Sequence, residues 1–200
     1  GGYAGKCWAS SGYQYPGPGS GGRIAVHART TTFSGVMGAY GEKNAANGAA
    51  AYISAAGTVY QNISGVTYLS IDNNGKYSEQ CTLLNDGNRL EYSFHEITLS
   101  RCGRLRIARV ASVPNTTTLT ATYVGGDKAG YVDFAYGTEL IVASEFKHAN
   151  SVVRAGAQLS VPPNVVFEGT TTTVMGSLVG GGVLNLTTGA VLELHAACEV

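Results

Sequence analysis

A glycine followed by two alternating apolar residues recurs along this chain and constrains its fold more than any other feature. The pattern is Gly-x-x-φ-x-φ, where φ is an apolar residue. Apolar residues at alternate positions are typical of a strand that buries one face, and a glycine between two such runs indicates a sharp bend. The copies begin at Gly21, Gly137, Gly156 and Gly189, and they place the apolar pairs Ile24/Val26, Leu140/Val142, Leu159/Val161 and Leu192/Leu194. The repeated unit is therefore strand, glycine corner, strand.

The segment "GPGSGGRIAVHA" (17–28) also contains a Gly-x-Gly-x-x-Gly sequence, formed by Gly17, Gly19 and Gly22. A dinucleotide-binding loop needs a buried strand before it and a helix after it, because the helix N-terminus holds the pyrophosphate. The residues that follow here have a period of two, which predicts a strand with Ile24 and Val26 turned inward. We interpret the glycines as a turn that leads into a strand, and we expect no cofactor.

Many short strands with glycine corners fit two architectures, a β-solenoid and a β-sandwich or jelly roll. The corners favour a chain that bends and continues, so we expect an all-β protein with one parallel β-solenoid domain over residues 21–200. Residues 1–20 are expected to be a Gly/Tyr-rich N-terminal segment or cap. The sandwich remains the alternative, since "NNGK" (73–76) and "NDGN" (85–88) are candidate hairpin turns.

The charge content excludes some classes of protein. Of 200 residues, 13 are Lys or Arg and 13 are Asp or Glu, so the net charge is zero and charged residues make up 13%, about half the share in a typical soluble domain. Such a chain is not a nucleic-acid binder by bulk charge, and no apolar run reaches the roughly 20 residues that span a membrane. The chain starts with Gly-Gly, from which we expect a processed chain or a piece of a longer protein.

Sequons and cysteines both indicate a secreted or cell-surface protein. Asn-x-Ser/Thr sequons, which are acceptors for N-glycosylation, occur at Asn62, Asn115 and Asn185. The four cysteines form no Cys-x-x-Cys pair and the histidines no metal-binding spacing, so we expect no metal site. We therefore expect an oxidising, extracellular setting.

The cysteine positions suggest how a solenoid would be cross-linked. Cys81 and Cys102 are 21 residues apart, which is close to one turn of a solenoid, and stacked strands lie within the distance that a disulfide spans. We therefore predict a Cys81–Cys102 disulfide. Cys7 and Cys198 stand near opposite ends and are expected to be free or bonded to a neighbouring subunit.

Three blocks of the N-terminal part, "GSGGRIAV" (19–26), "FSGVMGAYG" (33–41) and "AAGTVY" (55–60), resemble a recurrent sequence in very large secreted or cell-surface proteins. The repeats of those proteins form right-handed parallel β-helices of the pectin-lyase-like and fibrocystin-like kind. The close resemblance covers about residues 19–60, and it implies an extracellular scaffold or adhesive segment without catalytic residues. It implies, as partners, other copies or other parts of a larger assembly that forms a matrix, filament or surface layer.

Pectin-lyase-like folds include polysaccharide lyases and hydrolases, so an enzyme is the rival interpretation, and a glycan-binding domain is a third. Glycoside hydrolysis needs two nearby carboxylates, and the nearest pair in sequence is Asp127 and Asp133, with Lys128 beside the first. The paired Asp-Asp element of polygalacturonase-like enzymes is absent, and we interpret the two residues as a loop Asp and an outward strand Asp.

A group of arginines is the candidate binding site. Arg104 and Arg106 flank the inward Leu105, so both lie on the outer face of one strand. They could contact a sulfated or uronic polysaccharide, or they could be a solvated face neutralised by nearby glutamates. The residues assigned to this candidate anion- or glycan-binding site are Arg101, Arg104, Arg106 and Arg109.

Overall fold

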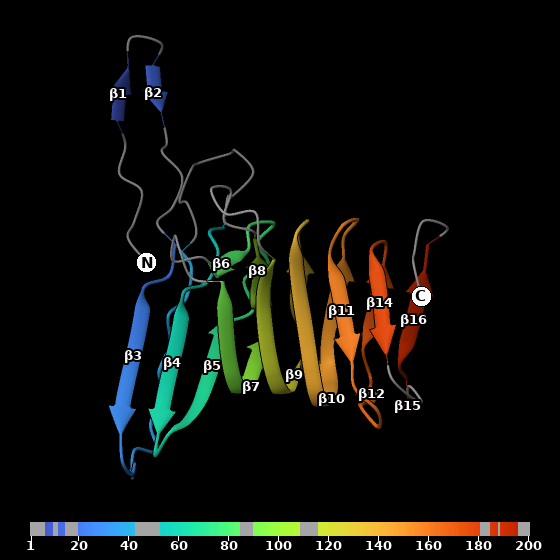
Figure 1. The fold of residues 1–200 in the computed structure, drawn as a ribbon. Coiled ribbons are helices and arrows are strands. Elements are labelled where there is room, and N and C mark those ends of the chain that lie inside the picture. Colours follow the sequence, from blue (N-terminus) through green and yellow to red (C-terminus); the bar gives the residue numbers. More distant parts are fainter. Residues whose placement is uncertain are drawn as a thin grey trace.

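The computed structural model describes residues 7–9, 12–14, 20–42, 53–84, 90–108, 116–180, 185–187 and 189–195. Within them the chain is all-β and has no helix (Figure 1). The strands are β1 (Cys7–Ala9), β2 (Gly12–Gln14), β3 (Arg23–Ala28), β4 (Thr58–Ile63), β5 (Val66–Asp72), β6 (Thr82–Leu84), β7 (Glu91–Ser100), β8 (Arg104–Ile107), β9 (Thr117–Phe134), β10 (Thr138–Val153), β11 (Gln158–Val161), β12 (Val166–Glu168), β13 (Thr171–Val174), β14 (Ser177–Gly180), β15 (Asn185–Leu186) and β16 (Val191–Leu194).

The structure corrects the expected fold class. Fourteen strands form one mixed sheet with the order β14-β11-β10-β9-β7-β5-β4-β3 along its main path, while β1 and β2 form a separate two-stranded sheet. The sheet is mostly parallel, but β4 and β5 are antiparallel, and the sheet does not close. The expected right-handed parallel β-solenoid is therefore wrong. A sandwich of two facing antiparallel sheets does not occur in the described part either.

The antiparallel pair has a local cause that the sequence analysis missed. Between β4 and β5 the chain turns at Ser64 and Gly65, whose φ angles are 52° and 86°. Positive φ at both central residues is the requirement of a two-residue type I′ hairpin turn. The hairpin reverses the chain direction, so β3 and β4, which pair in parallel, run opposite to β5 and the strands that follow it.

The glycine corners are confirmed where the repeat is strongest. Gly137 lies between β9 and β10, Gly156 between β10 and β11, and Gly189 between β15 and β16, with φ angles of 72°, 74° and 73°. Residues with a side chain rarely adopt this conformation. At these corners the backbone bends without reversing, and the next strand pairs in parallel with an earlier one.

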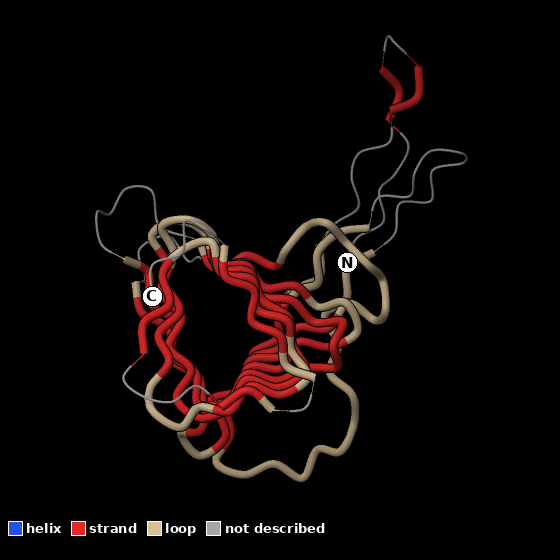
Figure 2. The backbone as a smooth tube through the Cα atoms, turned by 90° about the vertical axis from the view of Figure 1, so that its right-hand side faces the viewer, coloured by secondary structure: helices blue, strands red, loops and turns tan. Residues whose placement is uncertain are grey.

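The long strands carry several partners in succession. Along its length β10 pairs in parallel first with β11, then with β12 and then with β13. Figure 2 shows the strands superposed and bent, so that the sheet is strongly curved. The curvature buries one side of every long strand and leaves the other side facing outward.

Apolar columns fill the concave side of the sheet. Leu119, Leu140 and Leu159 lie in register on β9, β10 and β11 and are at most 1% exposed. Phe146 and Phe167 stack with ring centroids 5.4 Å apart. All are members of one buried cluster, so the alternation of apolar residues correctly predicted the inward face of these strands.

The turn interpretation of the glycine-rich segment is confirmed on its downstream side. Residues 23–28 form strand β3, in which Ile24 and Val26 are half-buried while Arg23, Ala25 and His27 are exposed. The proposed division between residues 1–20 and 21–200 stays a prediction. Among the described residues no helix could span a membrane.

Candidate anion-binding face

A buried aspartate ties two arginines together on the outer side of the sheet. Asp133 of β9 lies in register with Arg106 of β8, and its side chain is only 2% exposed. Arg106 donates from Nε (3.0 Å) and Nη2 (2.6 Å) to Asp133 Oδ2. Arg154, which follows β10, donates from Nε to Oδ1 (2.6 Å) and from Nη2 to Oδ2 (2.9 Å). One carboxylate therefore holds two guanidinium groups side by side.

The two arginines keep Asp133 ionised. Burial by itself would raise the pKa of this carboxyl group, but the hydrogen bonds from Arg154 and Arg106 outweigh it, and the net pKa is lowered. Hydrogen bonding to the charged form of an acid favours that form. Asp133 is thus an anchor for arginines and is unsuited to act as a general acid.

A third arginine lies between two tyrosine rings. The guanidinium carbon of Arg104 lies 4.7 Å from the ring centroid of Tyr131, its neighbour in register, and 5.5 Å from that of Tyr77. Its Nη1 donates to the carbonyl of Ser78 at 3.0 Å and to the Tyr77 hydroxyl at 3.3 Å. Cation–π contacts and these hydrogen bonds fix the orientation of the side chain.

A surface cavity of about 280 Å³ opens beside Arg104. Tyr77 and Tyr131 form part of its wall, and Ala129 and Gly130 contribute small residues. We call the outward surface formed by Arg104, Arg106, Arg154, Tyr77 and Tyr131 the arginine–tyrosine face.

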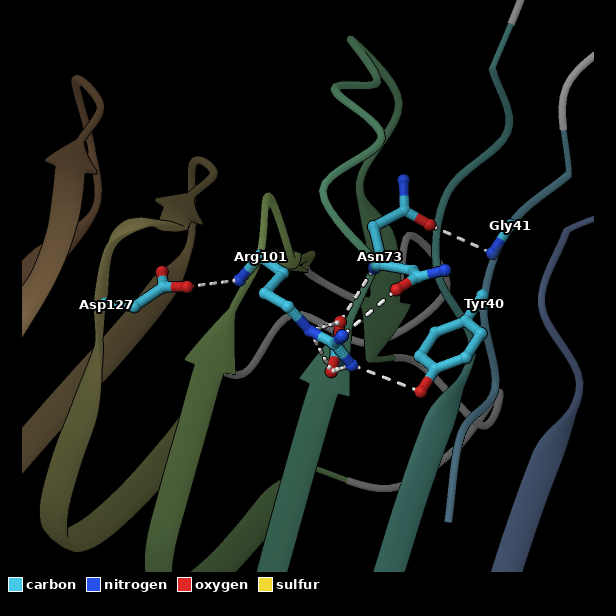
Figure 3. Close-up of polar contacts among 7 residues, drawn as sticks. Tyr40, Gly41, Asn73, Arg101 and Asp127 are labelled. Carbon is cyan, nitrogen blue, oxygen red and sulfur yellow. Dashed lines mark hydrogen bonds and ion pairs between the residues drawn. The ribbon is translucent and has the colours of Figure 1, made fainter. Parts of the chain in front are cut away.

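The structure separates Arg101 from this face. Arg101 bonds to the carboxylate of Asp72, and it donates to Asn74 Oδ1 (3.0 Å) and the Tyr40 hydroxyl (3.1 Å) (Figure 3). Its backbone N–H donates to Asp127 Oδ2 at 2.7 Å. The hydrogen bond with Asp72 is the main cause that raises the pKa of Arg101. Arg101 is therefore a structural tie between strands.

Of the arginines assigned to the candidate site, the structure brings Arg104 and Arg106 to one face, and Arg109 lies outside the described residues. No sequence pattern had pointed to Arg154, Tyr77 or Tyr131 as members of this site. Tyr131 and Asp133 flank the inward Val132 on β9, in the same way that Arg104 and Arg106 flank the inward Leu105 on β8. That signal places them on an outer face, but only the strand register places them beside the arginines.

The predicted Cys81–Cys102 disulfide is not formed, and both cysteines are free thiols. The strand pairing that begins just after Cys81 joins Thr82 to Leu105, three residues after Cys102, so this register does not align the two cysteines. Burial raises the pKa of the Cys81 thiol, which outweighs the opposite effect of Arg104. For Cys7 the structure describes only a backbone strand, and Cys198 lies outside the described residues.

The carboxylates that could serve an enzyme have separate partners. Asp127 is exposed and accepts hydrogen bonds from the backbone N–H groups of Arg101 and Ala129, whereas Asp133 is held by Arg106 and Arg154. Within the described ranges no group of three or more His, Cys, Asp or Glu side chains is placed to hold a metal ion.

Two of the sequons lie on described strands. Asn62, near the end of β4, is half-buried, and its Oδ1 accepts a hydrogen bond from Gly65 N at 3.1 Å. Asn185 begins β15 and is also half-buried. Asn115 lies outside the described residues. Glycosylation at all three positions stays a prediction.

Comparison of the chain with protein-family models, with curated proteins and with solved structures gave no match.

Proposed function

We propose that this chain is a non-enzymatic structural and adhesive segment of an extracellular assembly, in which copies associate end to end through the open edges of the sheet. The observation that carries the proposal is the apolar surface at the β14–β16 end. Val179, Leu186, Val191 and Leu194 are 48 to 50% exposed there. An exposed sheet edge with apolar side chains is a template for pairing with another β segment.

The exposed residues continue the buried columns of the core. Phe146, Phe167 and Leu186 lie in register on β10, β12 and β15, and their exposed fractions are 0%, 2% and 48%. Val174 and Leu194 are in register on β13 and β16, and their exposed fractions are 0% and 50%. One more layer of strands would cover these leucines as the earlier layers are covered. Among the described residues no strand covers this edge, and it therefore favours a partner that is itself a β-sheet.

A second copy of the chain fits this requirement. The opposite end of the sheet is the edge strand β3, which carries half-buried Ile24 and Val26. Contact between two different edges is heterologous, and it generates a filament wherever the rotation between successive copies does not close a ring. The net charge of zero removes the repulsion that keeps strongly charged proteins apart.

Two observations weigh against the rival interpretation, a polysaccharide-active enzyme. The pKa of Asp133 is lowered by its arginine partners, whereas a general acid needs a raised pKa. Asp127 accepts hydrogen bonds from two backbone N–H groups, those of Arg101 and Ala129. Asp133 therefore does not supply the general acid that hydrolysis of a glycosidic bond requires.

The test is self-association of the purified full chain, measured by light scattering over a concentration series and by negative-stain electron microscopy. We expect elongated oligomers for the wild type and monomers for the double variant Leu186→Lys/Leu194→Lys, with unchanged circular dichroism. The matched control is Val36→Lys, which charges another exposed apolar residue outside the strands and should leave the oligomers intact. A wild type that stays monomeric at every concentration would overturn the proposal.

A further inference from the structure

We propose that the arginine–tyrosine face binds the sulfate esters of a sulfated polysaccharide. Arg104, Arg106 and Arg154 bring three positive charges to this face, and Asp133 neutralises one of them. The chain as a whole has no net charge, so the remaining positive charge is a local property of this surface. The site is independent of end-to-end association, and it stands if that association fails.

The face still has hydrogen-bond donors for a ligand. Asp133 engages Nε and Nη2 of Arg106 and of Arg154, while within the described residues Nη1 of each has no hydrogen-bond partner. The two side chains are 42% and 46% exposed, so ligands can reach them. Because Asp133 already fixes both guanidinium groups, little side-chain entropy is lost when an anion binds.

The free donors of the two arginines suit a tetrahedral sulfate. A carboxylate is planar and pairs with two parallel N–H groups of one guanidinium group, such as those of its Nε/Nη2 edge. On Arg106 and Arg154 that edge is already occupied by Asp133. What remains on each side chain are the two N–H groups of Nη1 and the second N–H group of Nη2, and the oxygens of a tetrahedral sulfate point in several directions and can accept from both arginines.

The tyrosines supply the contact for the sugar itself. Tyr77 is 63% exposed, and it lines the cavity with its ring beside Arg104. Tyrosine rings present an apolar face together with a polar hydroxyl group, which matches the C–H face and hydroxyls of a pyranose. The cavity, about 280 Å³, lies just below the roughly 300–1,000 Å³ of pockets for drug-sized ligands. It therefore fits one sugar unit of a chain that continues over the surface.

Binding of the full chain is measured by titration calorimetry against dextran sulfate, polygalacturonate and uncharged dextran of matched length. We expect binding of dextran sulfate that weakens with added salt, and weak or no binding of the other two. Arg104→Gln removes one of the three positive charges of the face and should reduce the affinity about tenfold. Tyr77→Ala should reduce it several-fold, and Arg29→Gln, which removes an exposed arginine just after β3, should not change it.

The three variants also separate site binding from bulk charge. Tyr77 is exposed and its replacement leaves the core intact, so Tyr77→Ala decides the question if Arg104→Gln fails to fold. Equal losses in Arg104→Gln and Arg29→Gln, or no binding of dextran sulfate by the wild type, would refute the site. Equal affinity for polygalacturonate and dextran sulfate would refute the assignment to sulfate.

Discussion

Replacing Asp133 by asparagine tests how much the buried carboxylate contributes to stability. The substitution keeps the shape of the side chain but removes its charge and turns one of the two acceptor oxygens into a donor, which then faces a guanidinium group. Four N–H···O hydrogen bonds of 2.6 to 3.0 Å converge on this carboxylate. Asp133 is 2% exposed, whereas Arg106 and Arg154 are nearly half exposed.

The exposure of the arginines sets the magnitude. Breaking a fully buried ion pair costs about 3 to 5 kcal/mol because the remaining charge is left without solvent or partner. Here water can solvate the two arginines, so we expect the free energy of unfolding to fall by about 2 to 3 kcal/mol at pH 7. For a chain of this size that corresponds to a decrease in Tm of about 4 to 12 °C.

The same variant predicts a pH dependence with a definite sign. The pKa of Asp133 is lowered below its ordinary value of 3.8, so its contribution to stability is complete above that value and is lost as the pH falls through the folded-state pKa. The amide that replaces the carboxyl group does not titrate. The difference in unfolding free energy between wild type and Asp133→Asn should therefore be constant from pH 7 to about 5 and should shrink below about pH 4.

The assay is urea unfolding followed by circular dichroism across this pH range. Asp127→Asn is the control, because its exposed carboxylate accepts two backbone N–H groups and its loss should cost less than about 1 kcal/mol. A stability difference for Asp133→Asn that is the same at pH 3 and pH 7, or no larger than that of Asp127→Asn, would refute the reasoning.

Three further predictions concern the core, a corner and a sequon. Leu159→Ala should lower the free energy of unfolding by about 2 to 5 kcal/mol, because it leaves a cavity in the core. Leu194→Ala, at the half-exposed edge, should lower it by much less in the same urea unfolding assay. Equal losses of stability would contradict the burial of Leu159. Gly156→Ala, at φ 74°, should lower the free energy of unfolding by about 1 to 2 kcal/mol. Gly22→Ala, where an added Cβ meets nothing within 4 Å, should leave it nearly unchanged. A larger loss for Gly22→Ala than for Gly156→Ala would rule out strain at the corner. Expression in a secretory eukaryotic host should add a glycan at Asn62, read by mass spectrometry after endoglycosidase, and an unmodified asparagine would remove support for a secretory route.

The candidate site was predictable only in part. The alternation around Leu105 put Arg104 and Arg106 on one outer face, since side-chain direction in a strand follows from the local period of two. Nothing in the sequence joined Arg106 to Asp133, 27 residues later, or brought Arg154 to the same carboxylate. These contacts depend on strand register, and a shift by one residue would turn each side chain to the opposite face.

The sequence by itself determined the local features of the protein. Gly137, Gly156 and Gly189 marked corners, and the alternation about them marked the inward face, because backbone sterics and burial act over a few residues. The tertiary structure alone decided strand register: the pairing of β8 with β9 put Asp133 beside Arg106, and the pairing of Thr82 with Leu105 left Cys81 and Cys102 unaligned. The hairpin that makes the sheet mixed has a local cause, the turn at Ser64 and Gly65. Pairing depends on residues distant in the chain that compete for the same partners, so the free energy that selects it arises only when the whole sheet has formed.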